Sequence, residues 1–424
     1  MITLRWSEVA GLELGELRGA PEDGVVRRVH DDSREARPGD LFVAVNAGVR
    51  FVEDALARGA ATLVPRDQHA ALAELARLVR DRSDAQVVAV VGSTGKTTTK
   101  DALAALCGVV TPTVAAEASR NNEIGLPLTV LRLGPATRVL VTEMGMRGLG
   151  QIAELCTVAR PTLVLVTSIG PEHLELVGSV ENVARANAEA LDALPAGGIA
   201  VIPDGEPLLA PFLRAGLDVR RFDRASLRRE GDRWMFHVGR DELRLELPFT
   251  QRHLAENVLA ALTAYDALGL PLDRAQEGVA AIRLSSWRGE VLDLPGGGFV
   301  VNDAYNANPT SMQAALVDLA ERAGGRRRVA ILGQMAELGE QSDRYHSEIA
   351  SLLRTLGVEL VVAVGESARG YLATVEDGVL VADASAFDDI ASVLRPGDGI
   401  LVKGSRSVGL EGIPALIEKH SRAW

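Results

Sequence analysis

Short, continuous apolar runs alternate with amphipathic stretches along the middle of the chain. Residues 87–91, 139–141 and 163–166 are uninterrupted apolar runs, and segments of helical character separate them. Strands that are apolar on both faces belong to parallel sheets covered by helices on both sides. The central part of the chain is therefore predicted to be an α/β domain.

The first 84 residues show a shorter version of the same alternation. A turn at 38–40 precedes an apolar strand at 41–45, and a helix rich in Ala, Leu and Arg follows at about 68–82. This pattern predicts a small N-terminal domain, with the charged stretch 80–84 as the linker to the next one.

A second doubly wound sheet is predicted from residue 285 onward. A hairpin around residues 295–298 comes first, and helices then alternate with apolar strands at 329–332, 360–364 and 400–402. Residues 218–249 look instead like antiparallel strands that extend the central domain. The predicted fold class is α/β with three domains: a small N-terminal α/β domain at 1–84, a central P-loop ATPase-like parallel sheet at 85–284, and a C-terminal Rossmann-like doubly wound sheet at 285–424.

Composition and charge narrow the class of protein. The 424 residues carry 45 basic and 57 acidic side chains, a net charge of −12, which argues against a general basic surface for nucleic acid. Two cysteines are too few for a disulfide framework. No apolar run approaches the roughly 18 residues of a membrane span. We therefore expect a cytoplasmic protein that binds any anion locally. We also expect a monomer, although the sequence itself does not reveal the oligomeric state.

The strongest candidate for chemistry is the string G-S-T-G-K-T-T-T at residues 92–99, which follows an apolar strand and opens a helix. Backbone amides of a Gly-rich turn, the positive helix end and a lysine ammonium together hold polyphosphate, while a Thr hydroxyl can bind Mg²⁺. Lys96 is also one of only four lysines among the 45 basic residues, which fits a need for a compact ammonium group. We predict a nucleoside triphosphate site here.

Two further side chains follow strands of the same predicted sheet. Glu143 ends the strand that begins at 139, and His173 lies in the loop after strand 163–166, so both are expected at the carboxyl edge of the sheet. A carboxylate and an imidazole beside a phosphate loop suit Mg²⁺ binding and charge neutralisation. Taken alone, each of the two is as consistent with a solvated loop residue. Because both follow strands beside the phosphate loop, we predict Thr97, Glu143 and His173 as metal ligands.

Two polar segments of the third domain each have two interpretations. Residues 303–309 (D-A-Y-N-A-N-P) follow a strand and could contact a substrate, although Asn and Asp residues also build turns. Residues 403–407 (K-G-S-R-S) could form a second anion clamp or a polar strand-to-helix loop.

Taken in order, these motifs resemble the ATP-dependent Mur ligases of peptidoglycan synthesis, and the resemblance spans nearly the whole chain. The first domain contributes D-S-R at 32–34, and the central domain contributes the phosphate loop, N-N-E-I-G-L-P at 121–127 and E-M-G at 143–145. The third domain contributes Y-N-A-N-P-x-S-M at 305–312, which is the most specific string, and G-Q-M-A-E-L-G at 333–339. No D-N-P-R string is present, which argues against the sister ligase that adds the third, dibasic amino acid.

The resemblance implies an enzyme that uses ATP and Mg²⁺ to join D-alanyl-D-alanine to UDP-N-acetylmuramoyl-tripeptide through an acyl phosphate. Its partners would be these two substrates, without nucleic acid or a membrane span. By the same resemblance, the catalytic residues are Lys96, His173 and Lys403; the nucleotide contacts are Gly92, Ser93, Thr94, Gly95, Lys96, Thr97, Thr98, Asn257, Arg288 and Asp303; and the substrate contacts are Ser33, Arg34, Asn122, Asn306 and Asn308.

The chain departs from the family pattern at four places. Residues 52–54 (V-E-D) replace a D-G-H-like string, Leu254 replaces an Asn, and Gln334 replaces an Asp. Asn187 stands where the family carbamylates a lysine, and a short, neutral amide cannot replace that carboxylate. The alternative is that Asn187 merely occupies a solvated helix face.

Two other functions stay open at this point. A folylpolyglutamate-type ligase would keep the phosphate loop but should lack Y-N-A-N-P-x-S-M. A non-catalytic, nucleotide-switched binding protein would explain the departures as decay. Release of phosphate from ATP that depends on both substrates distinguishes a ligase from a switch. The sequence does not reveal the third residue of the tripeptide.

Overall fold

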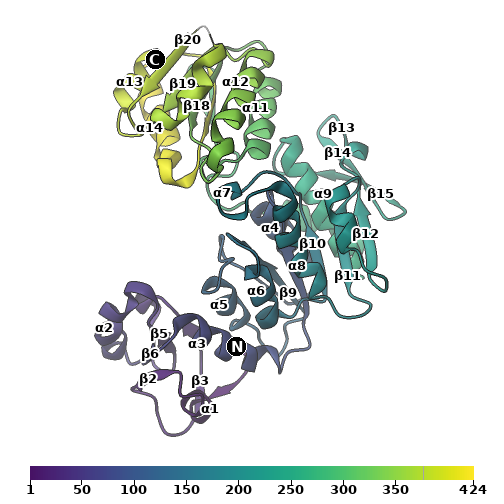
Figure 1. Cartoon of the computed structure of the whole chain (residues 1–424), viewed down its shortest axis with the longest axis vertical. Coiled ribbons are helices and arrows are strands. Elements are labelled where there is room, and N and C mark those ends of the chain that lie inside the picture. Colours follow the sequence, from purple (N-terminus) through teal and green to yellow (C-terminus); the bar gives the residue numbers. More distant parts are fainter. Residues whose placement is uncertain (376) are drawn as a thin grey trace. The chain divides into compact units, whose positions relative to one another are not determined.

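The computed structural model describes residues 1–375 and 377–424, and its elements confirm the predicted α/β fold class (Figure 1). The chain divides into two compact units, each formed from separate segments. Unit 1 contains a four-stranded sheet near the N-terminus and a six-stranded sheet, and unit 2 contains a second six-stranded sheet. Unit 1 comprises Met1–Thr167, Arg185–Pro248 and Asn257–Arg283, and unit 2 comprises Ser168–Ala184, Phe249–Glu256 and Leu284–Trp424.

A four-stranded sheet forms the N-terminal part of unit 1. Its elements and their neighbours are β1 (Leu4–Arg5), α1 (Trp6–Gly11), β2 (Gly15–Arg18), β3 (Val25–Val26), β4 (Val29–His30), β5 (Leu41–Val43), α2 (Val52–Ala57), β6 (Ala61–Pro65) and α3 (Gln68–Arg80). The strand order is β2-β6-β5-β4, with β2 antiparallel to β6 and the other pairs parallel. The strand predicted at 41–45 is β5, and Phe42 on it is fully buried.

The central sheet of unit 1 has six parallel strands in the order β12-β11-β10-β7-β9-β8. Because all six run the same way, the carboxyl ends of β7, β9 and β10 lie at one edge. The elements are β7 (Gln86–Val91), α4 (Lys96–Gly108), β8 (Thr113–Ala115), α5 (Gly125–Val130), β9 (Val139–Glu143), α6 (Gln151–Ala159), β10 (Leu163–Val166), α8 (Val180–Asp192), β11 (Ile199–Pro203), β12 (Asp218–Phe222), α9 (Arg252–Ala267) and α10 (Ala275–Ala280). The first residues of α8 (up to Ala184) and of α9 (up to Glu256) are assigned to unit 2.

The prediction of antiparallel strands over residues 218–249 is correct for most of that range and wrong for its beginning. β13 (Arg228–Glu230), β14 (Arg233–Val238) and β15 (Asp241–Glu246) form an antiparallel three-stranded sheet. β12, however, pairs in parallel with β11 at the edge of the central sheet. Its mixture of exposed and buried positions is typical of an edge strand and hides the parallel pairing from a periodicity analysis.

Unit 2 contains a six-stranded sheet in the order β16-β17-β21-β18-β19-β20, in which β16 is antiparallel and all other pairs are parallel. The hairpin predicted around residues 295–298 joins β16 to β17. The elements are α7 (Leu174–Val177), β16 (Glu290–Asp293), β17 (Phe299–Asn302), α11 (Pro309–Ala323), β18 (Arg328–Gly333), α12 (Ser342–Thr355), β19 (Leu360–Val364), β20 (Asp377–Val381), α13 (Phe387–Val393), β21 (Gly399–Lys403) and α14 (Ile413–Ser421).

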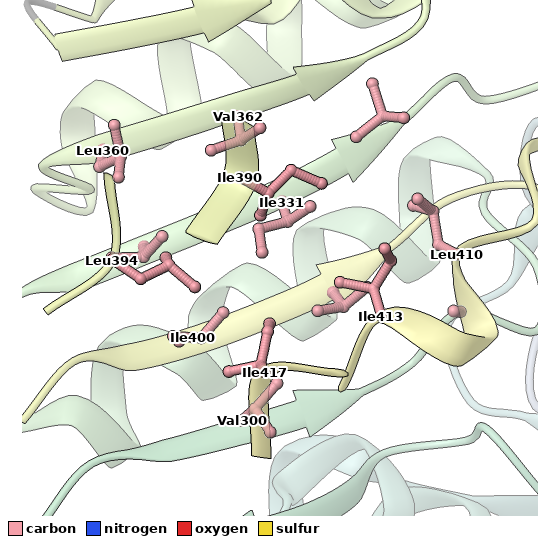
Figure 2. Packing of buried hydrophobic residues seen from close by; sticks show 14 of the residues in the cluster. Val300, Ile331, Leu360, Val362, Ile390, Leu394, Ile400, Leu410, Ile413 and Ile417 are labelled. Carbon is pink, nitrogen blue, oxygen red and sulfur yellow. The ribbon is translucent and has the colours of Figure 1, made fainter. Parts of the chain in front are cut away.

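One hydrophobic core of unit 2 lies between this sheet and the helices α13 and α14 (Figure 2). Val300 and Ile331 project from the strands toward Ile390 of α13 and Ile417 of α14, and all four side chains are fully buried. A buried aliphatic side chain of this size contributes about 1.5–3 kcal/mol relative to an exposed one. None of the described helices combines the length and the apolarity needed to cross a bilayer.

Candidate functional site

The segment 92–95 joins the central strand β7 to helix α4 in a tight turn. Gly95 has a φ of +80°, in the left-handed region, and a Cβ at this position would lie 2.3 Å from Oδ1 of Asn257. A residue with a side chain would meet both strain and a clash there. The turn therefore packs the backbone of the loop directly against Asn257, one of the predicted nucleotide contacts.

Three side chains hold this phosphate loop in shape. The hydroxyl of Thr167, just after β10, donates to the carbonyl of Thr94 (2.6 Å), and Oδ1 of Asn187 on α8 accepts from the amide of Gly92 (2.7 Å). Lys96 folds back, so that its Nζ donates to the carbonyl of Gly92. The ammonium group is thus held against the loop, where the backbone and the start of α4 favour an anion.

Glu143, the last residue of β9, is buried at the carboxyl edge of the sheet. Its Oε1 accepts a hydrogen bond from Nδ2 of Asn121 (2.8 Å), whereas its Oε2 is buried and has no hydrogen-bond partner among the described residues. A buried carboxylate oxygen without a donor is costly, and a bound ion or water usually accounts for it. Glu143 therefore presents an anionic oxygen that a cation can satisfy.

Thr97 contacts the same loop as Glu143. Its Oγ1 lies 3.2 Å from Oγ of Ser119, two residues before Asn121. Hydroxyl and carboxylate fit Mg²⁺, which takes few protein oxygens and completes its coordination with phosphate and water. Among the described residues, no group of three or more His, Cys, Asp or Glu side chains is placed to hold a metal ion.

Lys100 anchors the loop that carries Ser119 and Asn121. This lysine of α4 is fully buried, and its Nζ donates to the carbonyls of Ala116 (2.8 Å) and Ala118 (3.0 Å). Burying an ammonium group is costly unless it is paired and hydrogen-bonded, as it is here. Lys100 therefore fixes the conformation of residues 116–118 immediately before the residues that contact Thr97 and Glu143.

The same loop reaches the D-S-R segment of the first sheet. Nη1 and Nη2 of Arg120 both donate to Oδ1 of Asp31 (3.2 Å each). Next to it, hydrogen bonds from Arg34 lower the pKa of Asp32 to about 2. Ser33 is buried, and Arg34 is exposed at the surface. The predicted UDP-sugar residues thus neighbour the loop of the predicted metal site within unit 1.

Two asparagines of unit 1 have defined structural tasks. Oδ1 of Asn122 accepts from the amide of Gly125 (2.9 Å) at the start of α5, and its contact with substrate stays a prediction. Asn187 is buried, with 1% of its surface exposed, so the interpretation that it occupies a solvated helix face is wrong. It serves the phosphate loop through Gly92 instead.

In unit 2, His173 precedes helix α7 and has a φ of +49°. Its Nδ1 is hydrogen-bonded to Oε2 of Glu337, and its Nε2 lies 4.0 Å from Oε2 of Glu172. About a quarter of the His173 side chain (24%) is exposed to solvent. The imidazole is therefore partly accessible and lies close to two carboxylates.

Lys403, the last residue of β21, is buried in unit 2 with 2% of its surface exposed. Its Nζ donates to Oδ2 of Asp303 (2.6 Å) and to the carbonyl of Asn306 (2.9 Å). Both partners belong to the D-A-Y-N-A-N-P segment. The ammonium group therefore fixes the conformation of that segment, while Asn306 itself remains exposed.

The end of this segment builds a helix cap. Oδ1 of Asn308 accepts from the amide of Ser311 (2.9 Å), and Oγ of Ser311 accepts from the amide of Asn308 (3.1 Å), which forms a capping box at the start of α11. The turn-building interpretation therefore applies to Asn308. Nearby in unit 2, the guanidinium of Arg288 lies 3.8 Å from the centre of the Tyr305 ring, a cation–π contact.

Burial shifts the pKa of two groups close to this segment. It lowers the pKa of His253 to about 4, a shift that Asp303 opposes and Lys403 reinforces. It raises the pKa of Asp318 on α11 to about 6, although Arg322 lies 3.5 Å away and acts in the opposite direction. At neutral pH, the imidazole of His253 is therefore uncharged.

Sequence reasoning assigned no role to three residues of these sites. Asn121 stands beside Asn122 in the same string, Glu337 lies in G-Q-M-A-E-L-G, and Lys100 follows the phosphate loop by one helical turn. The scarcity of lysine in this arginine-rich chain was a usable signal for Lys100. Nothing in the sequence distinguishes Asn121 from Asn122, because only the packing shows which amide faces Glu143.

Two family models match the chain. The Mur ligase middle domain matches residues 90–265, and the Mur ligase, glutamate ligase domain matches residues 287–406. The first match covers the phosphate loop, Glu143 and Asn257, and the second covers Arg288, the segment 303–309 and Lys403.

Relatives extend this likeness to the whole chain. The UDP-N-acetylmuramoyl-tripeptide–D-alanyl-D-alanine ligase of Escherichia coli is 32% identical over 454 residues, which cover 99% of each chain. MurF from Thermotoga maritima in complex with ADP has a TM-score of 0.81 at 26% identity, over 94% of this chain and 98% of its own. MurF from Acinetobacter baumannii shares the fold, with a TM-score of 0.86 at 24% identity over 99% and 100%. The chain therefore belongs to the Mur ligase family, whose members are ATP-dependent ligases.

Proposed function

We propose that this enzyme joins D-alanyl-D-alanine to UDP-N-acetylmuramoyl-tripeptide at the expense of ATP. The observation that carries the proposal is the phosphate loop with Lys96 held against it, together with Thr97 and the buried Glu143, which contact Ser119 and Asn121 of one loop. The substrates are those named for the relative that is 32% identical along the whole chain. The third amino acid of the tripeptide is left open.

The nucleotide binds at the phosphate loop in this proposal. Lys96 moves from the carbonyl of Gly92 to a phosphate oxygen, and the backbone amides of residues 92–98 hold the remaining phosphate charge. Thr97, Glu143 and His173 are the residues assigned to Mg²⁺, which would neutralise part of the phosphate charge when bound. The other nucleotide contacts are assigned to Asn257, Arg288 and Asp303.

The reaction proceeds in two steps. An oxygen of the terminal tripeptide carboxylate attacks the γ-phosphorus of ATP, the bond to the bridging oxygen breaks, and ADP leaves. The amine of the dipeptide then attacks the acyl carbon, loses a proton, and expels inorganic phosphate with the electrons of the C–O bond. A carboxylate is a poor electrophile, so the first step provides the leaving group, while the protein contributes position and positive charge.

The remaining predicted residues take part in two different ways. Ser33, Arg34 and Asn122 are assigned to the UDP-sugar, and Asn306 to the dipeptide. Lys403 and Asn308 support the site without touching the substrate in this proposal. Lys403 binds the side chain of Asp303, and Asn308 caps helix α11. They hold the segment 303–309 in the shape that presents Asn306.

The test is release of phosphate from ATP by the purified full chain, with each substrate left out in turn. The expected result is release only when a UDP-muramoyl-tripeptide and D-alanyl-D-alanine are both present, with the amide product seen by mass spectrometry. L-glutamate as the better acceptor would favour the folylpolyglutamate-type ligase. Nucleotide binding without release under any condition would favour the nucleotide-switched binding protein.

A further inference from the structure

Lys100 is a buried lysine on α4 of unit 1 that has no part in the reaction as proposed above. We infer that Lys100 is a positioning residue for the cation that accompanies the nucleotide. It holds the loop 116–122, whose side chains contact Thr97 and Glu143, the two predicted metal ligands of unit 1. This inference rests on the proposed function and adds one residue to it.

The ammonium group of Lys100 is fully used by the protein itself. An ammonium has three N–H donors, and Nζ finds three acceptors. It donates to the carbonyls of Ala116 (2.8 Å) and Ala118 (3.0 Å), and it lies 2.5 Å from Oδ1 of Asp101. A buried charge is tolerated when it is paired and hydrogen-bonded in this way. Without the ammonium group, the loop would lose its side-chain attachment to α4.

One of these acceptors belongs to a residue in an uncommon conformation. Ala118 has a φ of +47°, in the left-handed region that residues with a side chain seldom adopt. Such a conformation persists where the surroundings over-determine it. The side chain of Ala118 is exposed, so its packing does not supply the restraint. The hydrogen bond from Lys100 to the carbonyl of Ala118 supplies it, and it sets the direction in which the chain continues toward Ser119.

The chain beyond Ala118 carries the two side chains that a cation site needs. Oγ of Ser119 lies 3.2 Å from Oγ1 of Thr97. Nδ2 of Asn121 donates to Oε1 of Glu143 (2.8 Å), which leaves Oε2 as the buried oxygen without a hydrogen-bond partner among the described residues. Mg²⁺ demands near-ideal octahedral geometry from its oxygen ligands. The conformation of one loop therefore decides how a hydroxyl and a carboxylate oxygen are presented to it.

Asn121 is also fixed from the side of β9. Its carbonyl accepts from the amide of Gly145 (2.9 Å), and a Cβ at Gly145 would lie 3.0 Å from Nδ2 of Asn121. The side-chain amide therefore packs on the backbone that follows Glu143. Lys100 and Gly145 hold the loop at two places, and Lys100 is the one that can be replaced without altering the strand that carries Glu143.

The test is calorimetric binding of a non-hydrolysable ATP analogue to the full chain, once with Mg²⁺ and once with EDTA. The ratio of the two dissociation constants is the Mg²⁺-dependent gain in affinity. Loss of a residue that orients metal ligands weakens metal binding by about 10- to 100-fold, so we expect this gain to fall by about 10-fold or more in Lys100→Met. The affinity in EDTA should stay unchanged, because Thr167 and Asn187 hold the phosphate loop independently of Lys100.

Lys419→Met, on the exposed face of α14, is the matched control and should keep the full gain. A purely structural role for Lys100 would weaken binding equally with Mg²⁺ and with EDTA, and this result would overturn the inference. An unchanged gain in Lys100→Met, or the absence of any gain in the unmodified protein, would overturn it as well.

A second variant covers the case in which Lys100→Met does not fold because Asp101 is left without its cation. Replacing both members of a buried ion pair costs much less than replacing one. Lys100→Met combined with Asp101→Asn should therefore fold and show the same loss of the Mg²⁺-dependent gain, whereas Asp101→Asn alone, which keeps the ammonium group, should retain it. Equal gains in these two variants would contradict the inference.

A rescue experiment tests the route through Ala118. Glycine adopts the left-handed region without the steric cost of a Cβ. Ala118→Gly, added to the variant that lacks the ammonium group of Lys100, should therefore restore part of the lost gain. If this addition restores nothing, Lys100 does not act through Ala118 as inferred.

These binding experiments contain neither the tripeptide nor the dipeptide, so they separate the inference from the proposed function. If the Mg²⁺-dependent gain requires Lys100 but the unmodified protein releases no phosphate with the two substrates, the proposed reaction fails while the role of Lys100 stands. If phosphate release is normal and Lys100→Met keeps the full gain, the reaction stands and the inference fails.

Discussion

The phosphate loop of unit 1 and the segment 303–309 of unit 2 both follow a buried strand and precede a helix, but they are held in different ways. The first turns at its own glycines, and two neutral side chains, Thr167 and Asn187, hold it through hydrogen bonds to its backbone. The second depends on Lys403, which binds Asp303 and Asn306 from about a hundred residues away. One lysine of this chain thus folds onto the turn that precedes it, and another fixes a turn that is distant in the sequence.

Of the changes that distinguish the two regions, Lys96→Ala is expected to have the largest effect, and the effect is on turnover. Loss of one charged group aimed at the transferring phosphoryl should lower turnover by about 10²- to 10³-fold or more. The stability of the fold should hardly change, because Lys96 contacts carbonyls of its own loop and is not part of the core.

Turnover and the thermal midpoint should be measured together, with Lys419→Ala on the exposed face of α14 as the matched control. Near-normal turnover in a folded Lys96→Ala protein would refute the phosphate-loop assignment.

Lys403→Ala should show the opposite pattern. Removing one partner of a buried ion pair leaves an unpaired charge and costs about 3–5 kcal/mol, so the urea midpoint of unit 2 should fall strongly. Urea titrations of Lys403→Ala and Lys419→Ala, compared with the unmodified protein, measure the effect. Unchanged stability with lost turnover would mean that Lys403 acts on the ligand as Lys96 does.

The third expectation concerns Asp318, on the helix that Asn308 caps. Its pKa is raised from 3.8 to about 6 in the folded state, so between these values the folded chain binds more protons than the unfolded one, and stability falls as pH rises. Asp318→Asn removes this dependence. From pH 4 to pH 7, the unmodified protein should lose about 2 kcal/mol relative to the variant. Parallel stability curves for the two proteins over this range would contradict the assignment.

The last prediction is that added bicarbonate has no effect on turnover. Asn187 has no amine to carbamylate, and its amide is already used by Gly92, so turnover should not respond to bicarbonate. Turnover in bicarbonate-depleted buffer, with and without added bicarbonate, measures this. A several-fold rescue would show that a carbamate forms elsewhere, and the interpretation of Asn187 would be wrong.

Much of the fold could be predicted because its information is local. The apolar strands of both doubly wound sheets, the hairpin before β17 and the phosphate loop are each encoded in a few consecutive residues. The parallel pairing of β12 could not be predicted, because an edge strand loses the continuous apolar pattern that identifies its neighbours.

In the candidate site, too, residues within a local motif could be predicted, and residues placed by tertiary packing could not. Lys96 and Glu143 were accessible to sequence reasoning, since each follows a recognisable strand. The partners that orient the functional groups were not. Whether Asn121 or Asn122 faces Glu143 depends on the path of one loop, and Glu337 meets His173 only through tertiary packing.

The loop from Ala116 to Asn122 has one more consequence, for how its length can vary. Surface loops usually tolerate insertions. In this loop, three consecutive residues, Ser119, Arg120 and Asn121, contact Thr97, Asp31 and Glu143 respectively, and Lys100 clamps the backbone just before them. One added residue within the triplet would take at least one of these side chains out of reach of its partner. Natural and engineered variation in loop length should therefore be excluded here and should accumulate instead in turns that make no such contacts.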